Sequence, residues 1–244
     1  MSVHRFFAIS NNVIDDEFVR LEAEDFSHIR ALRLRPSELF IVCDGEGTDY
    51  ICRLGERGED VAVIVETRRT LGEPDVDCGV YLAYAKGDRL DYAVQKSVEL
   101  GAREIILFPS ERCIAVPGDA SKKAARFKRI SLEAAKQCGR GRVPNVVTMS
   151  SFEDAVSKAA RAKLSLFCYE DEKKRSLKSV FESYTGKFET VSIFTGSEGG
   201  FTPQEARLAV DSGMISVTLG ARILRCETAP ISVLAALMYH SNNL

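Results

Sequence analysis

Hydrophobic residues in the N-terminal part of the chain form short runs that are separated by polar turns. The runs predict five strands, namely Arg5–Ile9, Phe18–Leu21, Leu39–Cys43, Asp49–Leu54 and Val61–Glu66. Turns are supplied by Asp44-Gly45 and Glu56-Arg57-Gly58, and Asp25–Arg33 fits one short helix. Several short strands at this spacing predict a small β-barrel.

The remainder of the chain has a different pattern, in which segments with the hydrophobic pattern of a strand alternate with segments that have the pattern of a helix. The predicted strands are Val80–Tyr84, Glu104–Phe108, Leu164–Cys168, Val191–Phe194 and Ile215–Leu219. The predicted helices are Leu90–Leu100, Lys122–Cys138, Phe152–Arg161, Pro203–Asp211 and Ala229–Tyr239. The helix from Pro203 has the clearest start, because Thr202 can cap it and Glu205 follows three residues later. Such alternation predicts an α/β domain with a largely parallel sheet.

Charge divides the chain at the same place. Residues 1–75 contain nine arginines, no lysine and sixteen acidic residues, which is a balance of −7. Subtraction from the totals of 33 basic and 35 acidic residues leaves 24 and 19 for the rest, which is a balance of +5. Leu71-Gly72-Glu73-Pro74 is a cluster of residues that interrupt helices and strands. We therefore predict two domains, covering residues 1–72 and 73–244.

The composition excludes several classes of protein. The chain is 45% hydrophobic and 28% charged, which is typical of a soluble globular protein. Its longest strongly apolar stretch, Pro230–Tyr239, is about half the length that crosses a bilayer, and His4-Arg5-Phe6-Phe7 lacks the apolar core of a signal peptide. Seven cysteines are scattered without a C-x-x-C pair, and only three histidines accompany them. These features favour reduced thiols, a cytoplasmic location, no membrane segment and no metal site.

Two unusual loops follow predicted strands in the C-terminal part. Ligands of parallel α/β sheets bind beyond the carboxyl ends of strands, so we examine the loops after Cys168, Phe194 and Leu219. The loop that follows Phe194 contains three glycines, which allow close approach of backbone to a ligand or form a flexible turn. It matches neither the Rossmann nor the P-loop motif. The loop after Leu219 contains two arginines and Glu227, which either serves a site or complements the dipole of the next helix.

Basic residues gather in two places. Residues 122–142 include eight lysines and arginines and one acid, and the run closes in a glycine flanked by Arg140 and Arg142. Arg30 and Arg33 would share one face of the predicted helix Asp25–Arg33. Such a run is either a solvated helix face or a set of donors for nucleic-acid phosphates, and two basic surfaces could flank one RNA strand.

With these residues in hand, the sequence resembles the bacterial ribosomal RNA small-subunit uridine-N3 methyltransferases of the SPOUT superfamily over nearly its whole length. Four motifs in the same order are far more specific than one glycine-rich loop. The segments that carry the match are His4–Phe7, Lys86–Asp91 with Gln95–Gly101, Ser110–Cys113 with Gln137–Arg140, and the paired loops Gly196–Phe201 and Leu219–Thr228.

The resemblance implies a PUA-like β-barrel followed by a trefoil-knotted α/β methyltransferase domain, a homodimer, and S-adenosylmethionine as cofactor. The substrate would be a specific uridine of ribosomal RNA, either free or in the small ribosomal subunit. Implied cofactor-binding residues are Cys168, Tyr169, Thr195, Gly196, Gly199, Gly200, Leu219, Gly220, Ile223, Leu224 and Cys226. Together with the basic clusters described above, the resemblance gives as predicted RNA-binding residues Arg5, Arg30, Arg33, Arg112, Arg140 and Arg142.

Three residues are candidates for the chemistry of methyl transfer. Arg5, at the family's N-terminal arginine, would stabilise negative charge on uracil, acting on the cofactor site of the partner chain. Glu198 and Glu227 would accept the imide proton or order the loops, and the sequence alone does not identify the base. Cys226 is expected to pack rather than to act as a nucleophile, because attack by cysteine belongs to methylation at a uracil carbon.

The chain departs from the usual family pattern at Ser197 and Ala221, where proline is common, and at Cys226, where threonine is common. Loss of two prolines leaves the loops less preordered, which bears on cofactor affinity more than on reaction type. Two other functions therefore stay open. One is a related SPOUT enzyme that methylates another nucleotide or a ribose 2′-hydroxyl, and the other is a non-catalytic RNA-binding module.

Overall fold

The computed structural model describes residues 4–7, 13–15, 17–35, 37–55, 60–114 and 120–244. The chain divides into two compact units. Unit 1 consists of Met1–Glu73 together with Ala135–Val143, and unit 2 consists of Pro74–Ala134 together with Pro144–Leu244. The second segment of unit 1 differs from the linear division at residue 72 predicted above, because a piece from the middle of the chain packs with the N-terminal residues.

Unit 1 contains a six-stranded sheet and one helix. The strands are β1 (Arg5–Phe7), β2 (Val13–Asp15), β3 (Phe18–Arg20), β4 (Phe40–Cys43), β5 (Thr48–Leu54) and β6 (Val61–Arg69). Their order across the sheet is β1-β4-β5-β6-β3-β2, and only β1 and β4 run parallel. The five predicted strands are present, and β2 is an additional one. Ala8, Ile9 and the predicted turn Glu56-Arg57-Gly58 lie outside the described residues.

The core of unit 1 is formed by the alternating inward residues of these strands and by α1 (Ala23–Ala31). Phe6 and Phe40 meet edge to face, with ring centroids 5.8 Å apart, and Ile29 of α1 is fully buried. The turn at Asp44 forms as predicted, because its Oδ1 accepts hydrogen bonds from the backbone of Glu46, Gly47 and Thr48. Where the sequence predicted a small β-barrel, the structure has one six-stranded sheet that encloses a single apolar core.

Glu73 fixes the returning segment within unit 1. Its carboxylate accepts hydrogen bonds from Nε and Nη2 of Arg140, at 3.2 and 2.9 Å, and from the backbone N–H groups of Gly141 and Arg142, at 2.9 and 3.1 Å. Gly141 packs so closely that a Cβ there would lie 1.9 Å from Oγ1 of Thr70. A glycine is therefore required at this approach.

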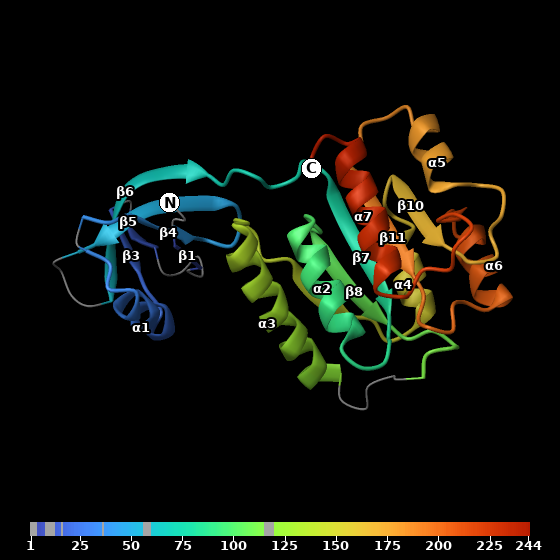
Figure 1. Ribbon diagram of the computed structural model, residues 1–244, viewed down its shortest axis with the longest axis horizontal. Coiled ribbons are helices and arrows are strands. Elements are labelled where there is room, and N and C mark those ends of the chain that lie inside the picture. The colour runs from blue at the N-terminus through green and yellow to red at the C-terminus, as the bar shows by residue number, and fades with distance from the viewer. Residues whose placement is uncertain (1–3, 8–12, 16, 36, 56–59, 115–119) are drawn as a thin grey trace. The chain divides into compact units, whose positions relative to one another are not determined.

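Unit 2 is a six-stranded, fully parallel sheet. Its strands are β7 (Asp77–Ala83), β8 (Glu104–Phe108), β9 (Asn145–Thr148), β10 (Leu164–Cys168), β11 (Thr190–Thr195) and β12 (Ile215–Val217). Its helices are α2 (Arg89–Glu99), α4 (Phe152–Ala159), α5 (Leu177–Ser183), α6 (Pro203–Asp211) and α7 (Thr228–His240), and it shares α3 (Ala120–Cys138) with unit 1. Figure 1 shows α2 and α7 side by side against the sheet.

The local sequence explains several of these boundaries. At α6 the predicted capping box is present: Oγ1 of Thr202 accepts from the N–H of Glu205, and the Glu205 carboxylate accepts from the N–H of Thr202. Helices α4 and α5 have the simpler cap: the side chain of Ser151 accepts from the N–H of Asp154, and that of Ser176 accepts from the N–H of Ser179. Strand β9 and helix α5 are absent from the predicted elements, because both are short and α5 buries only Val180 and Phe181.

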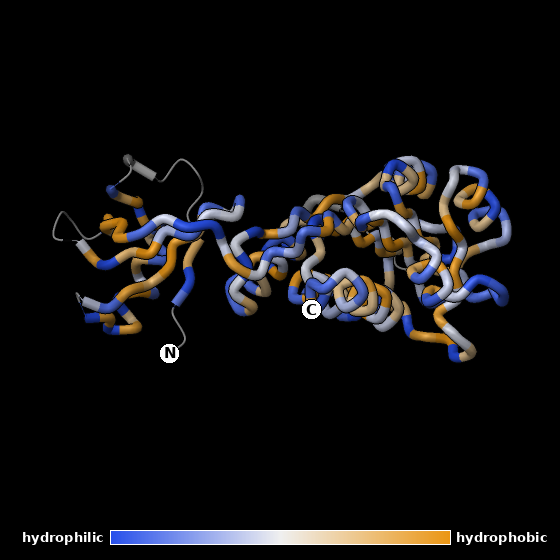
Figure 2. Tube along the Cα trace, turned by 90° about the horizontal axis from the view of Figure 1, so that it is seen from above, coloured by the Kyte–Doolittle hydropathy of each residue, from blue (hydrophilic) through white to orange (hydrophobic). Residues whose placement is uncertain are grey.

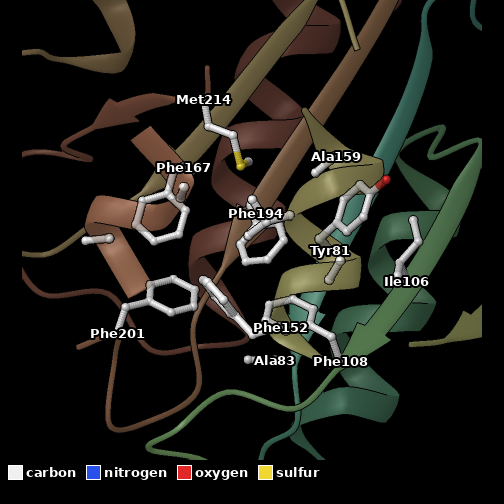
Figure 3. Packing of buried hydrophobic residues seen from close by; sticks show 14 residues of the cluster. Tyr81, Ala83, Ile106, Phe108, Phe152, Ala159, Phe167, Phe194, Phe201 and Met214 are labelled. Atoms are coloured by element: carbon white, nitrogen blue, oxygen red, sulfur yellow. The ribbon is translucent and has the colours of Figure 1, made fainter. Parts of the chain in front are cut away.

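Aromatic side chains fill the core between the sheet and helices α4 and α6. Phe167, Phe194 and Phe201 are at most 1% exposed, and their rings pack together with Phe152 of α4 (Figure 3). Burial of each such ring contributes about 1.5–3 kcal/mol relative to leaving it exposed. Hydrophobic stretches alternate with hydrophilic ones along both units (Figure 2). Among the described residues, no helix combines the length and apolar character needed to cross a membrane.

The strand order locates the place where a ligand can bind. Across the sheet the order is β12-β10-β11-β7-β8-β9. The connection after β7 leads toward β8 and β9 on one side, and the connection after β11 leads toward β12 on the other side. Loops that leave neighbouring strands in opposite directions open a crevice at the carboxyl edge of such a sheet. The two unusual loops of the sequence leave β11 and β12 at this edge.

Candidate functional site

A cavity of about 610 Å³ lies at the carboxyl ends of β10, β11 and β12. It is lined by every residue predicted to bind a cofactor, and by Glu198 and Glu227 as well. Its volume is within the range of about 300–1,000 Å³ that is typical of small-molecule sites. The structure therefore brings together, inside unit 2, residues from three loops that are far apart in the sequence.

The glycine-rich loop after β11 is held by several hydrogen bonds. The N–H of Gly200 donates to the carbonyl of Ser197 at 3.0 Å, which closes a tight turn, and Nη1 of Arg112 donates to the carbonyl of Gly199 at 3.1 Å. Gly200 has a φ of +65°, and a Cβ there would lie 1.8 Å from Oε1 of Glu170, another residue of the cavity wall. Glycine is required at this position for both reasons.

The loop after β12 forms the opposite wall. Gly220 has a φ of +106°, which again favours glycine. The carbonyl of Arg225 accepts from the N–H groups of Thr228 and Ala229, at 2.9 and 3.0 Å, and so joins the loop to the first turn of α7. Glu227 is the N-cap residue of α7, but its side chain makes no capping hydrogen bond. Its carboxylate accepts a hydrogen bond from Sγ of Cys226 at 3.2 Å instead, and the residue lines the cavity.

Arg89, the first residue of α2, links the two loops. Its Nη1 donates to Oε1 of Glu198, and its Nε lies 3.8 Å from Oε2 of Glu227. The backbone N–H of Lys86 also donates to Glu198, at 3.0 Å. One guanidinium therefore bridges two carboxylates, one on each wall. Arg89 belongs to the Lys86–Asp91 motif quoted above, but that motif did not reveal this contact.

The hydrogen bonds of Glu198 also affect its acidity. Burial alone would raise the pKa of this carboxyl, but the backbone N–H groups and Arg89 outweigh it and hold the pKa below its usual value. A carboxylate with a lowered pKa is a weaker proton acceptor at neutral pH. Of the two roles considered for Glu198, the geometry thus favours ordering of the loops.

The two cysteines of the cavity are poor nucleophiles. Burial raises the pKa of Cys226 to about 12, with further contributions from the hydrogen bond to Glu227 and the nearby carboxylates. Burial likewise raises the pKa of Cys168 to about 12. A thiol with such a pKa is protonated at neutral pH and unreactive. This agrees with the interpretation of Cys226 as a packing residue.

Three further basic residues of the cavity wall were not assigned to the site from sequence, namely Lys173, Arg222 and Arg225. All three are exposed. Within the described part of the chain, Arg222 and Arg225 have no side-chain hydrogen bond or ion pair. Their presence in the loop after β12 was noted, but nothing in the sequence indicated that their side chains border the cavity.

Arg5 has a firm place inside unit 1. Its Nη1 and Nη2 donate to the two carboxylate oxygens of Asp49, at 2.6 and 2.9 Å, and Thr70 donates to the same carboxylate at 2.6 Å. Asp49 is 1% exposed. The predicted action of Arg5 on a neighbouring chain stays a prediction, and the structure adds an ion pair within the sheet that this prediction did not include.

The predicted phosphate contact Arg140 lies in a more buried setting than the sequence indicated. Its side chain is 5% exposed and forms the ion pair with Glu73. The ion pair with Glu73 gives Arg140 a role in the packing of unit 1, and its predicted contact with RNA stays a prediction. Both Arg140 and Arg142 adjoin glycines in the sequence, so the sequence did not show that Arg140 is the more buried of the two.

The other predicted RNA contacts lie in different settings. Arg30 is exposed on α1 and stacks over the ring of Phe26 at 5.7 Å. Arg33 is exposed but lies beyond the end of α1, with a φ of +52°, so the shared helix face predicted for Arg30 and Arg33 is wrong. Arg112 is exposed beside the glycine-rich loop, whereas Nε of Arg142 donates to the carbonyl of Glu46 at 3.0 Å.

The cavity suits a small ligand that has both apolar and charged parts. Its walls combine the apolar residues Leu219, Ile223 and Leu224 with three carboxylates, from Glu170, Glu198 and Glu227, and with four basic side chains, from Arg89, Lys173, Arg222 and Arg225. Across the described ranges, no group of three or more His, Cys, Asp or Glu side chains is arranged to hold a metal ion.

Comparison with known proteins identifies the family to which this chain is similar. The family model described as RNA methyltransferase domain matches residues 73–238, and the model described as RNA methyltransferase PUA domain matches residues 21–66. The ribosomal RNA small subunit methyltransferase E of Bacillus subtilis is 30% identical over 92% of this chain and 91% of its own length. The protein of the same description from Mesomycoplasma hyopneumoniae is 31% identical over 95% of this chain and 97% of its own.

A solved structure agrees with this result. The crystal structure of a ribosomal RNA small subunit methyltransferase E from Neisseria gonorrhoeae, bound to S-adenosyl methionine, superposes with a TM-score of 0.85. It is 31% identical in sequence, and the match covers 98% of each chain.

Proposed function

Because the chain belongs to the RNA methyltransferase family, we propose that it methylates ring nitrogen 3 of a specific uridine in small-subunit ribosomal RNA, with S-adenosylmethionine as the methyl donor. The observation that supports this most strongly is the cavity after β10, β11 and β12, which is lined by all eleven residues predicted for the cofactor. The description of the relatives supports the rRNA substrate, and the four sequence motifs support the uridine nitrogen.

The cavity residues fit the cofactor. The tight turn at Gly200 and the left-handed backbone at Gly220 leave room where side chains would otherwise stand. Glu170 lines the cavity outside the Arg89 pair, and its carboxylate would offer negative charge to the sulfonium or ammonium group of the ligand. When bound, the cofactor supplies an electrophilic methyl group. The residues Leu219, Ile223 and Leu224 would surround its apolar parts and exclude water from the reacting atoms.

The residues of the chain have separate tasks in this proposal. Arg89, Glu198 and Glu227 join the two loops, which would hold the cofactor in one orientation relative to the uracil ring. Nitrogen 3 of uracil must lose its proton before it can attack, and negative charge then spreads over the ring oxygens. Donors aimed at that charge lower the barrier more than any other single effect. Water or Glu227 is the proton acceptor that this geometry favours, since Glu198 has a lowered pKa.

We also propose the knotted topology and the homodimer implied by the resemblance. Strand β12 lies at one edge of the sheet, whereas α7 packs against α2 and β11, so the intervening loop must cross the carboxyl edge of the sheet. Helix α7 buries Val233, Leu234, Leu237 and Met238 in its own chain but leaves Tyr239 75% exposed. That exposed side of α7 is available to a second copy, and sedimentation of the protein tests for the dimer.

The proposed reaction is tested by nucleoside mass spectrometry of small-subunit rRNA from cells that lack the protein. We expect 3-methyluridine to disappear and to return when the gene is restored. Loss of a ribose-methylated nucleoside instead would assign the protein to a different RNA methylation. Unchanged rRNA, combined with failure to bind S-adenosylmethionine in calorimetry, would leave an RNA-binding module.

A further inference from the structure

Arg222 and Arg225 are unusual among the cations of the cavity. Arg89 is neutralised by Glu198 and Glu227, and Nζ of Lys173 donates to the carbonyl of Glu170. Arg222 and Arg225 line the same cavity, yet their side chains have no hydrogen bond or ion pair with any residue that the structure describes. Two guanidinium groups without a partner beside one cavity leave several N–H donors that an anion from outside the chain can accept.

The cofactor is a poor binding partner for two guanidinium groups, those of Arg222 and Arg225. Its reacting centre is a sulfonium cation, which two nearby guanidinium groups would repel rather than bind. The uracil ring, in contrast, becomes negative when nitrogen 3 loses its proton, and the charge spreads onto the oxygens at carbons 2 and 4. A guanidinium group offers several N–H donors in a rigid plane, which matches such planar acceptors.

Arg5 was the sequence-based candidate for this task, but its guanidinium is used within its own chain. Both of its Nη atoms donate to Asp49, which is buried and would otherwise keep an uncompensated charge. Release of Arg5 toward a substrate would therefore carry a large energetic cost. Arg222 and Arg225 require no such release, because they already border the cavity with free donors.

We propose that Arg222 and Arg225 are the catalytic residues that stabilise the negative charge on uracil during methylation, an inference that rests on the proposed function. In this step the N3–H bond breaks and the proton leaves to a base or to water. The N3 electron pair then forms the bond to the methyl carbon, while the C–S bond breaks and its electron pair stays on sulfur. The two guanidinium groups hold the uracil oxygens from proton loss until the N–C bond has formed.

The test uses the full-length protein with Arg222→Ala, Arg225→Ala and, as a matched control, Arg207→Ala. Arg207 is an exposed arginine of α6 in the same unit, and it does not line the cavity. At saturating RNA, we expect kcat to fall by about 10²–10³-fold in the Arg222 or Arg225 variants, the range seen when one donor to a developing oxyanion is removed. Affinity for S-adenosylmethionine, measured by calorimetry, should stay unchanged in all three.

A second substrate separates charge stabilisation from simple RNA binding. Transcripts that contain 5-fluorouridine in place of uridine have a more acidic nitrogen 3, so the anion formed on proton loss requires less stabilisation by the protein. We expect the loss of kcat in Arg225→Ala to shrink by roughly tenfold on this RNA, because less negative charge is left for the missing guanidinium to stabilise. A fall in RNA affinity with normal kcat at saturation would assign the arginines to phosphate binding and overturn the proposal.

The remaining outcomes are also decisive. Weaker binding of S-adenosylmethionine would assign Arg222 and Arg225 to the cofactor carboxylate, contrary to the proposal. Full activity in both variants would overturn the proposal and leave the proposed function intact. Absence of 3-methyluridine with the wild-type protein would overturn the proposed function and this inference together.

Discussion

Gly200 and Gly213 differ in what surrounds them but share a left-handed backbone. Their φ angles are +65° and +92°, so an alanine at either position is strained by about 1–2 kcal/mol. A Cβ at Gly200 would displace the Glu170 carboxylate from the cavity wall, whereas a Cβ at Gly213 would meet nothing within 4 Å. We predict that Gly200→Ala abolishes detectable S-adenosylmethionine binding in calorimetry and that Gly213→Ala preserves it.

Both variants should unfold at similarly reduced denaturant concentrations, so the pair separates loss of the site from loss of stability. Equal affinities for the cofactor in the two folded variants would move the binding site away from the loop that contains Gly200.

Glu73 and Arg140 show how much a sequence can hide about one residue. Glu73 stands in the predicted domain boundary, and Arg140 closes a basic run predicted to be a solvated face or a set of phosphate donors. In the structure the two residues form an ion pair in which both side chains are largely buried. Burial alone would raise the pKa of Glu73, but the hydrogen bonds from Arg140, Gly141 and Arg142 outweigh it and lower the pKa below its ordinary value of 4.5. Pairs between residues 67 positions apart leave no local signal in the sequence.

The lowered pKa gives a pH dependence of defined sign. A carboxyl whose folded pKa is depressed stabilises the fold above its unfolded pKa, and this stability is lost as the pH falls through the folded value. We predict that the free energy of unfolding of unit 1 decreases below about pH 4.5 and that Glu73→Gln removes part of this slope. At pH 7, Glu73→Ala should cost about 3–5 kcal/mol, because Arg140 stays buried without its partner.

Asp60→Asn provides the comparison in urea titrations. Asp60 lies 3.9 Å from Arg20 in an ion pair that is about 60% exposed on both sides, and such pairs contribute about 0–1 kcal/mol. Equal effects of the Glu73 and Asp60 changes would show that the Glu73 contacts add no stability.

Helix α2 and the two cavity loops depend on one another through Arg89. Without this guanidinium, Glu198 and Glu227 would face each other across the cavity as like charges. We predict that Arg89→Ala weakens S-adenosylmethionine binding by roughly tenfold, or about 1.4 kcal/mol, in calorimetry. Adding Glu227→Gln to Arg89→Ala should recover part of that affinity, because it removes one of the two like charges.

Arg103→Ala is the matched control for Arg89→Ala. Arg103 also pairs with a carboxylate, that of Asp77, at a distance of 3.6 Å. This pair lies at the amino ends of β7 and β8, whereas the cavity lies at the carboxyl ends of the strands. If Arg103→Ala weakens cofactor binding as much as Arg89→Ala does, the effect is a general loss of stability rather than a separation of the loops.

The elements themselves were largely predictable, and the exceptions have physical causes. Strand β8 and helix α6 have the predicted bounds, because a continuous apolar run and a complete capping box mark them. Strand β9 follows Pro144 and has only four residues, so its pattern is too short to identify. Helix α1 ends two residues before the predicted Arg33, because the chain enters a left-handed conformation there.

Location of the cavity could also be predicted, since parallel strands deliver their loops to one edge. The sequence therefore placed the loops after β10, β11 and β12 together. Contacts such as Arg89 with Glu198, or Arg5 with Asp49, depend on tertiary packing of distant segments. Their partners could not be chosen from a sequence that contains 33 basic and 35 acidic residues.

Residues 1–75 have a net charge of −7, yet exposed arginines are present in both units, where the proposed RNA substrate would contact them. Arg30 and Arg33 are exposed in unit 1, and Arg112 is exposed in unit 2. We predict that replacing each with alanine lowers the slope of log affinity against log salt concentration by about 0.7 for single-stranded RNA. Cofactor affinity should be unaffected by the changes in unit 1.

Arg142, which is half-buried, should give a smaller change, and Arg20→Ala serves as a control because Arg20 is paired with Asp60. Filter binding of rRNA fragments at several salt concentrations measures the slopes. Identical slopes for the wild type and for every variant would mean that these arginines form a solvated surface without RNA contacts.

The most direct measurement of the proposed activity is methyl transfer by the purified protein. Isotope-labelled S-adenosylmethionine is mixed with small-subunit rRNA from cells that lack the protein, and the digested nucleosides are separated by mass spectrometry. We predict that the label appears in 3-methyluridine with the wild-type protein and is absent with Gly200→Ala. Label in a ribose-methylated nucleoside, or in no nucleoside at all, would contradict the proposed function.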